Sequence, residues 1–186
     1  MKKEKKPIKN AIRQGHTEEL VDHYWGSINY VLSLIRASEI KAGLILSFYG
    51  ILLNFIFQNI GIVLTQAANN LPLYILLGLW SLCMVASIYF SIRCFMPRIE
   101  SKYDSNIFFF GDVVSKFGTI KQFSKLFYKI SLEEEELFDQ LGQQIFIISK
   151  IAAFKFRHVN RSLKLLALGL VFLLLVAVYY LIAVKV

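Results

Sequence analysis

Three long uncharged runs dominate the hydrophobic pattern of this chain. None of them contains an Asp, Glu, Lys or Arg: 43–64, 71–92 and 165–184. A helix needs about 20 apolar residues to cross the ~30 Å of hydrocarbon in a bilayer, and each run has that length. The pattern therefore predicts an all-α membrane protein with three transmembrane helices. We place these helices at 43–66, 72–96 and 164–184.

Apolar residues at helical spacing extend the first and third runs beyond the membrane. In 17–42 they recur every three or four positions after Thr17, which is typical of an N-cap because two acidic residues follow it. A second apolar stripe follows Ser131-Leu-Glu-Glu134, a capping-box sequence, and leads into the third run. We expect two long helices, from about Glu18 to Leu64 and from the capping box to about Val184. Their non-membrane halves should pack together as stalks, because neither apolar face tolerates water.

The segment between the second and third runs is expected to form a small helical insert on the stalks. Thr119 can cap a short amphipathic helix there, and a compact apolar run, 107–110, precedes it. With the second stalk, this insert makes up a predicted helical region at 97–163. Residues 1–16 are basic and polar, and we expect a disordered tail that contacts anionic headgroups or only sets topology.

The distribution of positive charge predicts the topology. The net charge is +8, with eight Lys and Arg in 1–41, none in 65–71 and twelve in 93–164. Because positively charged loops stay in the cytoplasm, the N-terminus and 97–163 are expected there, with the turn 66–70 outside. The positive residues flank the membrane helices and do not alternate with aromatics along one groove. The lipid bilayer is therefore the expected partner, and a nucleic acid polymer is not.

No motif in the sequence indicates catalysis. The three histidines, His16, His23 and His158, lack metal-ligand spacing, and no phosphate-binding glycine loop or nucleophile elbow occurs. The acidic run 133–136 opens a helix, where the helix dipole explains it. We therefore expect no enzyme activity, no cofactor and no metal site.

A stripe of small and polar residues follows one face of the first membrane helix. It consists of Gly43, Ser47, Gly50, Asn54, Gln58, Gly61 and Thr65. Amides at membrane depth are costly unless paired, so this face is expected to turn away from lipid. It either packs tightly against another helix, with hydrogen bonds between them, or rearranges to line a pore. A possible partner stripe lies on the second helix: Cys83, Ser87, Ser91 and Cys94.

Basic and aromatic residues near the stalks could form a pocket for an anionic ligand. Arg can bind a phosphate through two parallel hydrogen bonds, and an aromatic ring can stack on a base. The residues predicted for this pocket are Arg36, Arg98, Phe109, Phe110, Lys150, Arg157 and Arg161. The alternative is that the positive members are ordinary topology charges near the membrane.

Three segments resemble the Pycsar transmembrane effectors. Ala37-Ser-Glu-Ile-Lys-Ala42 opens into the first span, and Asn106-Ile-Phe-Phe-Phe-Gly-Asp112 is similar to the family's Phe-Phe-Gly segment after the second span. Residues 144–152, followed by Lys155-Phe156, resemble the segment before the last span. The resemblance extends over roughly residues 17–184, in the same order and spacing.

The resemblance implies a bacterial antiphage effector of the inner membrane. In such systems a cyclase makes a cyclic pyrimidine mononucleotide during infection, and the effector then impairs the membrane in an abortive response. Related membrane proteins respond to cyclic oligonucleotides, so the ligand is left open within the cyclic nucleotides. A homo-oligomer is expected, because a shift of the stalks would move the polar stripe of the first membrane helix and so drive oligomerisation or the opening of a pore.

A different class of protein would fit the same spans. A non-enzymatic membrane scaffold or accessory subunit would use its helical region to dock a cytoplasmic protein and would bind no nucleotide. A membrane enzyme is a third alternative, which the lack of a convergent acid–base or metal set disfavours.

Overall fold

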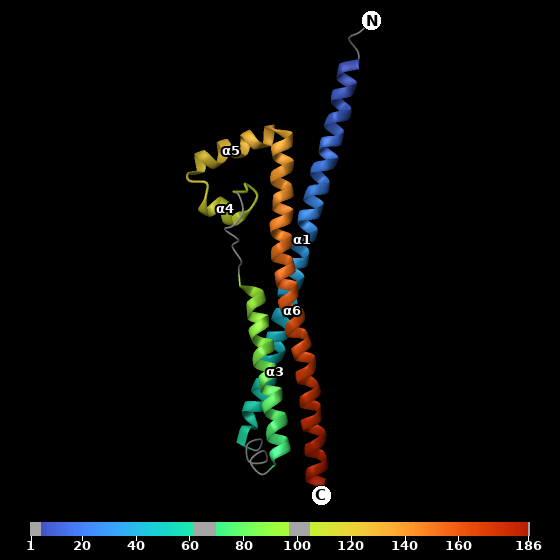
Figure 1. Ribbon diagram of the computed structural model, residues 1–186, viewed down its shortest axis with the longest axis vertical. Coiled ribbons are helices and arrows are strands. Elements are labelled where there is room, and N and C mark those ends of the chain that lie inside the picture. Colours follow the sequence, from blue (N-terminus) through green and yellow to red (C-terminus); the bar gives the residue numbers. More distant parts are fainter. Residues whose placement is uncertain (1–4, 62–69, 97–104, 186) are drawn as a thin grey trace. The chain divides into compact units, whose positions relative to one another are not determined.

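The predicted all-α architecture is confirmed. A computed structural model describes residues 5–61, 70–96 and 105–185, and the described residues contain helices and connections but no strand (Figure 1). The helices are α1 (Lys5–Gln58), α3 (Leu71–Phe95), α4 (Phe110–Ser115), α5 (Ile120–Leu132) and α6 (Glu134–Lys185).

Three of these helices are long and apolar enough to cross a membrane, as predicted. The segments are His16–Gln58, Leu71–Phe95 and Glu134–Ile182. Pro72 lies in the first turn of α3, where its missing N–H costs no helical hydrogen bond. Helix α6 continues without interruption to Lys185, as the sequence indicated.

Two predicted helix starts differ from the structure. Helix α1 begins at Lys5, and the structure therefore has helix in 5–16, where the sequence suggested a disordered tail. Lys, Arg and Ala favour helix, and Pro7 falls in the first turn, where it is tolerated. Thr17 is consequently inside the helix, and its hydroxyl donates a hydrogen bond to Oε1 of Glu134 at 2.9 Å.

The second difference concerns the start of α6. Ser131 belongs to α5, and its hydroxyl donates to the Phe127 carbonyl at 2.7 Å instead of capping the next helix. Glu133 is the C-cap of α5, and α6 begins at Glu134. The predicted cap at Thr119 is confirmed: a complete capping box joins Thr119 and Gln122.

The chain divides into two compact units. Unit 1 comprises Met1–Leu34 and Arg98–Ala152, and unit 2 comprises Ile35–Pro97 and Ala153–Val186. Both units therefore take residues from α1 and α6, whereas α4 and α5 belong to unit 1 and α3 to unit 2.

In unit 1 the two stalk segments pack against each other, as predicted. The rings of Tyr24 in α1 and Phe138 in α6 are 5.3 Å apart between centroids. Gly142 faces Tyr24 from α6, and a Cβ there would lie 3.9 Å from the ring. The buried side chains Ile28 and Leu141 belong to the same pair of stalks.

Unit 2 is a three-helix bundle. The colour gradient in Figure 1 shows α3 running opposite to the neighbouring stretches of α1 and α6. Ala42, Ile45, Tyr49, Cys94 and Val159 form its buried core. Many large apolar side chains of the unit remain exposed, among them Ile51, Leu82 and Leu174, as a lipid-facing surface requires.

Candidate functional site

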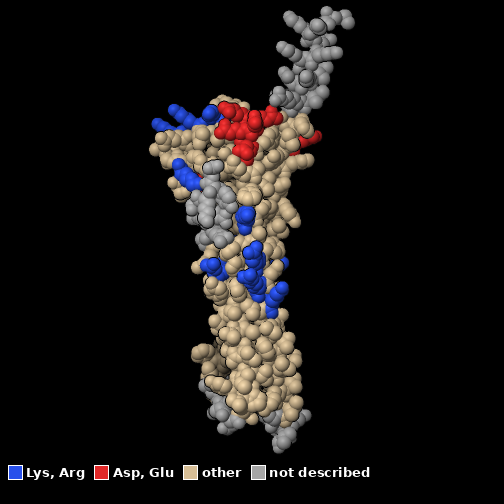
Figure 2. All heavy atoms as spheres, viewed as in Figure 1, with Lys and Arg blue, Asp and Glu red and all other residues tan. Residues whose placement is uncertain are grey.

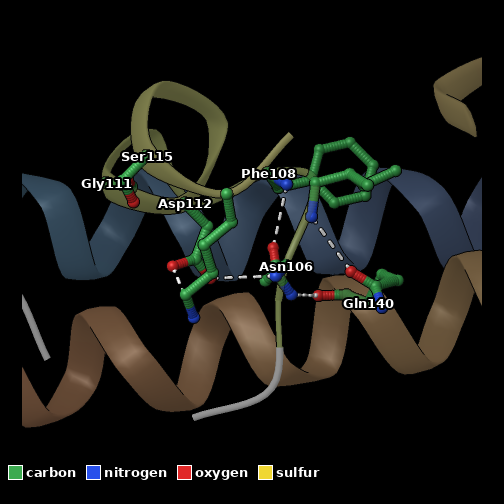
Figure 3. Close-up of polar contacts among 8 residues, drawn as sticks. Asn106, Phe108, Gly111, Asp112, Ser115 and Gln140 are labelled. Atoms are coloured by element: carbon green, nitrogen blue, oxygen red, sulfur yellow. Dashed lines mark hydrogen bonds and ion pairs between the residues drawn. The ribbon is translucent and has the colours of Figure 1, made fainter. Parts of the chain in front are cut away.

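A buried asparagine anchors the segment 106–112, here called the aromatic loop, in unit 1 (Figure 3). Asn106 has no exposed surface. Its Nδ2 donates to the backbone carbonyl of Gln140 in α6 at 2.6 Å, and its Oδ1 accepts from the Phe108 N–H at 2.8 Å. The Ile107 N–H donates to Oε1 of Gln140 at 3.1 Å. The side-chain amides of Asn106 and Gln140 thus satisfy two N–H groups of the loop backbone and fix the loop to α6.

Asp112 closes the aromatic loop from its other end. Its Oδ2 accepts a hydrogen bond from the Asn106 N–H at 2.9 Å, and its Oδ1 pairs with Lys116 Nζ at 2.9 Å. The carboxylate is buried and lies in the first turn of α4, where the helix dipole favours a negative charge. The loop therefore begins and ends at residues that bind each other.

This anchoring decides which phenylalanines of the loop are accessible. Ile107 and Phe109 are buried, whereas Phe110 is 80% exposed. The Phe108 ring lies edge-on to Trp25 of α1, with centroids 6.0 Å apart, and 5.7 Å from Phe127 of α5. The loop thus joins α1 and α5 through aromatic contacts.

The aromatic contacts continue along α5. The ring of Phe127 is 5.8 Å from Phe123, which is 5.7 Å from Phe117. Ring pairs at these distances contribute beyond the area they bury. A change at Phe108 therefore alters the contacts of both α1 and α5.

The residues predicted to bind an anionic ligand belong to both units. In unit 1, Phe109 is buried, and Lys150 is exposed with its Nζ 5.2 Å from the Phe146 ring. In unit 2, Arg36, Arg157 and Arg161 are exposed, and the Arg161 guanidinium lies 5.7 Å from the Phe90 ring. Arg98 lies outside the described residues. Their joint role in a pocket stays a prediction.

In unit 2, one lysine connects all three helices. Lys155 of α6 is only 5% exposed, and its Nζ donates to Glu39 Oε1 of α1 and to the Cys94 carbonyl of α3, each at 2.7 Å. Cys94 is in the last turn of α3, where carbonyls lack a helical partner and a cation is favoured. The ammonium thus neutralises the Glu39 carboxylate of α1 and caps the C-terminal end of α3.

A cluster of three serines lies between α3 and α6. Ser162 is fully buried, and its Oγ is 2.9 Å from Ser87 Oγ and 2.7 Å from Ser91 Oγ. Small hydroxyl side chains allow close helix approach and hydrogen bonding within a membrane. Cys94 Sγ likewise lies 3.7 Å from the Lys155 carbonyl. Cys94 Sγ is equally 3.7 Å from the Ser38 carbonyl of α1. The serines of α3 thus bind α6, Cys94 contacts both α1 and α6, and a pairing of these α3 residues with the first-helix stripe stays a prediction.

The polar stripe of α1 is mostly uncovered within one chain. A Cβ on Gly43 would lie 3.6 Å from the Phe95 ring, so this end of the stripe is in contact with α3. The members beyond Gly43 that the structure describes are exposed: Ser47, Gly50, Asn54, Gln58 and Gly61. Thr65 lies outside the described residues. The expectation that this face turns away from lipid needs a partner and stays a prediction.

Sequence reasoning missed the roles of Gln140, Lys155 and Ser162. Lys155 had a visible signal, because it falls on the same helical face as the apolar residues Ala152 and Val159. A charge on an apolar stripe indicates a buried partner more than a topology signal. Gln140 had no such signal, since an amide on a half-exposed stalk is common.

These features define the chain as an all-α membrane protein with three helices long and apolar enough to span a bilayer and with a helical unit built around an anchored aromatic loop. Residues 23–182 match the family model described as Pycsar effector protein domain, and the chain belongs to this family. The resemblance noted from the sequence is thereby confirmed.

Two curated relatives are similar over most of the chain. Pycsar effector protein PtPycTM of Propioniciclava tarda is 24% identical over 160 residues, which cover 82% of this chain and 76% of the relative. Pycsar effector protein SaPycTM of Staphylococcus aureus is 26% identical over 156 residues, covering 83% and 92% respectively. No solved structure matches significantly.

Replacing Asn106 by Leu should release the aromatic loop. The variant keeps the side-chain volume but leaves the Phe108 N–H without its acceptor, which costs about 1–3 kcal/mol. We expect hydrogen exchange in 106–112 to accelerate about tenfold or more, measured by mass spectrometry on the full chain. Ser105→Ala, at the exposed neighbouring position, is the control, and equal exchange in the two variants would contradict the anchoring role.

Lys155 and Glu39 should be energetically coupled. Glu39→Gln leaves a buried ammonium without its counter-charge, whereas Lys155→Met combined with Glu39→Gln removes both charges. A double-mutant cycle on the free energy of unfolding in mixed detergent–SDS micelles should give a coupling of about 1–3 kcal/mol. Lys164→Met, an exposed lysine on the same helix, should show no coupling to Glu39. Additive effects of the first pair would exclude the proposed link.

Proposed function

We propose that this chain is a membrane effector of bacterial antiphage defence, which a cyclic nucleotide activates to impair the inner membrane and abort infection. The observation that carries this proposal is the match to the Pycsar effector model over residues 23–182. The two curated relatives carry the same effector name, which supports the effector role. The favoured ligand is a cyclic pyrimidine mononucleotide.

The proposed orientation has the N-terminus and the 97–163 region in the cytoplasm. It rests on the excess of Lys and Arg in these segments and on their absence from 65–71. This orientation would expose the aromatic loop to a cytoplasmic second messenger.

Unit 1 offers groups of the right chemistry for nucleotide binding. Phe110 presents an open ring to which a base could stack, and Lys150 presents an exposed ammonium for a phosphate. A ligand acts only if it prefers one arrangement of the helices over another. The aromatic loop is suited to such a preference, since Phe108 contacts both α1 and α5.

The membrane step is proposed to use the polar stripe of α1 in a homo-oligomer. Asn54 and Gln58 are exposed in the single chain, and each amide both donates and accepts. In hydrocarbon these groups are stabilised only by partners of the same kind, which a second copy supplies. A rearranged assembly with these amides facing inward would make the membrane permeable.

One observation favours the scaffold as a second candidate function. Apolar side chains on the surface of α4 and α5 are strongly exposed: Phe110, Val114, Ile120 and Leu132. Large apolar side chains that are exposed to this degree are a feature of surfaces that a protein partner covers. Under this alternative, no nucleotide would bind.

Purified full-length protein should bind a cyclic nucleotide selectively. In calorimetric titrations with cyclic CMP, cyclic UMP, cyclic AMP and cyclic GMP, we expect one pyrimidine ligand to bind best. Phe110→Ala should weaken that binding about tenfold, because stacking on an aromatic ring contributes roughly 1–3 kcal/mol. Ile120→Ala, an equally exposed apolar residue, is the control. Failure of all four nucleotides to bind folded protein would favour the scaffold.

The double variant Asn54→Leu, Gln58→Leu should abolish toxicity while leaving ligand binding unchanged. Removing the amides takes away the interhelical hydrogen bonds proposed to hold the assembly, about 0.6–2 kcal/mol for each. The readout is membrane depolarisation in cells that co-express a nucleotide cyclase. Phe55→Leu together with Phe57→Leu changes exposed apolar residues of the same helix and serves as the control. Depolarisation that persists in the double variant would exclude the stripe mechanism.

A further inference from the structure

An apolar groove runs between α1 and α6 in unit 2. Its volume is about 420 Å³, and Leu44 and Phe48 of α1 face Leu163 of α6 across it. The α1 residues that line it lie roughly a third of a turn around the helix from the polar stripe. The groove is therefore a different surface from the one proposed for oligomerisation.

One end of the groove is polar. Lys41 and Asn160 line it there, on opposite walls, and Lys41 Nζ lies 5.8 Å from the ring centroid of Phe156. On α6, Arg157 lies three residues before Asn160, so its exposed side chain borders the same end. The groove thus has a cationic mouth and an apolar body.

The cations at the mouth lack a counter-charge in their own unit. Among the described residues of unit 2, Glu39 is the one acidic residue, and its carboxylate already binds Lys155 at 2.7 Å. On the face drawn in Figure 2, Lys and Arg gather in a band around the middle, and the described surface below that band shows no charge of either sign. An anion is therefore the complementary partner for the mouth.

The dimensions of the groove fit a lipid. From Lys41 to Phe48, α1 rises about 10 Å, or roughly two-thirds of one leaflet of a ~30 Å hydrocarbon core. The mouth lies at the charged edge of the span, where phosphates of the membrane are found. Leu44 and Leu163 are more than half exposed, so an occupant would also touch the surrounding bilayer.

We propose that this groove binds one anionic phospholipid, with its phosphate at Lys41 and Asn160 and an acyl chain along Leu44, Phe48 and Leu163. A free nucleotide does not match the apolar body of the groove. A second copy of the chain would bring its own cations against the mouth, since the exposed charges described in unit 2 are all positive. This site is independent of the nucleotide-activated function proposed above.

Native mass spectrometry of the full-length protein tests the proposal. The protein is equilibrated in micelles containing equal amounts of phosphatidylglycerol and phosphatidylcholine with identical acyl chains. The wild type should retain one phosphatidylglycerol in preference to phosphatidylcholine. Lys41→Gln should reduce this preference about fivefold, the effect of one lysine near an anionic headgroup.

Matched variants separate the groove from general charge. Arg36→Gln removes an exposed cation from another face of α1 and should leave the preference unchanged. Leu163→Trp should fill the groove and abolish retention of the lipid, and Leu44→Trp should do the same from the opposite wall. Leu168→Trp, which is exposed outside the groove, is the control for added bulk.

Three results would overturn the proposal. Equal retention of the two lipids by the wild type would remove the anionic specificity. Equal losses in Lys41→Gln and Arg36→Gln would assign the preference to the whole band of cations. Full lipid retention in both tryptophan variants, with loss of a dimer mass, would assign the groove to a second copy of the chain.

Discussion

The arrangement of unit 2 depends on the contacts of the Lys155 ammonium with Glu39 and with the Cys94 carbonyl. A buried charge is costly unless it is paired and hydrogen-bonded, and here the two partners come from the two other helices. No helix of the bundle can slide or rotate alone without leaving the ammonium, the Glu39 carboxylate or the Cys94 carbonyl unpaired. The serine cluster at Ser162 adds a neutral contact that keeps α3 and α6 close.

In unit 1 the elements are held together by a buried amide side chain instead of a buried charge. Asn106 fixes the aromatic loop to the backbone of α6, and Asp112 fixes the loop to itself. The exposure of Phe110 follows from this, because the anchored backbone directs its neighbour Phe109 inward. Residues of the segments that carry the family resemblance thus also form the polar contacts inside each unit.

The helices and spans could be predicted because hydrophobic periodicity and uncharged length are local properties of a sequence. The cap at Thr119 was equally local. Ser131 was misassigned because α5 ends at Leu132 and α6 begins at Glu134, so a capping sequence for the second helix overlaps the last turn of the first. The individual side-chain contacts between helices were not predictable from the sequence. The sequence around Ser87 does not tell which neighbouring helix its hydroxyl contacts, and only the packed bundle shows that it binds Ser162 of α6. For Lys155, position on an apolar face could have indicated burial but not its acceptors.

The order in which the chain is made gives the Lys155 contacts a further consequence. Lys155 follows Cys94 by 61 residues and Glu39 by 116, so both acceptors leave the ribosome before their donor. At about 5–20 residues per second, the first two spans wait roughly 3–12 s after Cys94 is made. During that time Glu39 is a charged group without its partner at the edge of an incomplete bundle. A nascent chain that stalls before α6 therefore keeps the Glu39 carboxylate and the Cys94 carbonyl without the ammonium that binds both of them in the complete bundle.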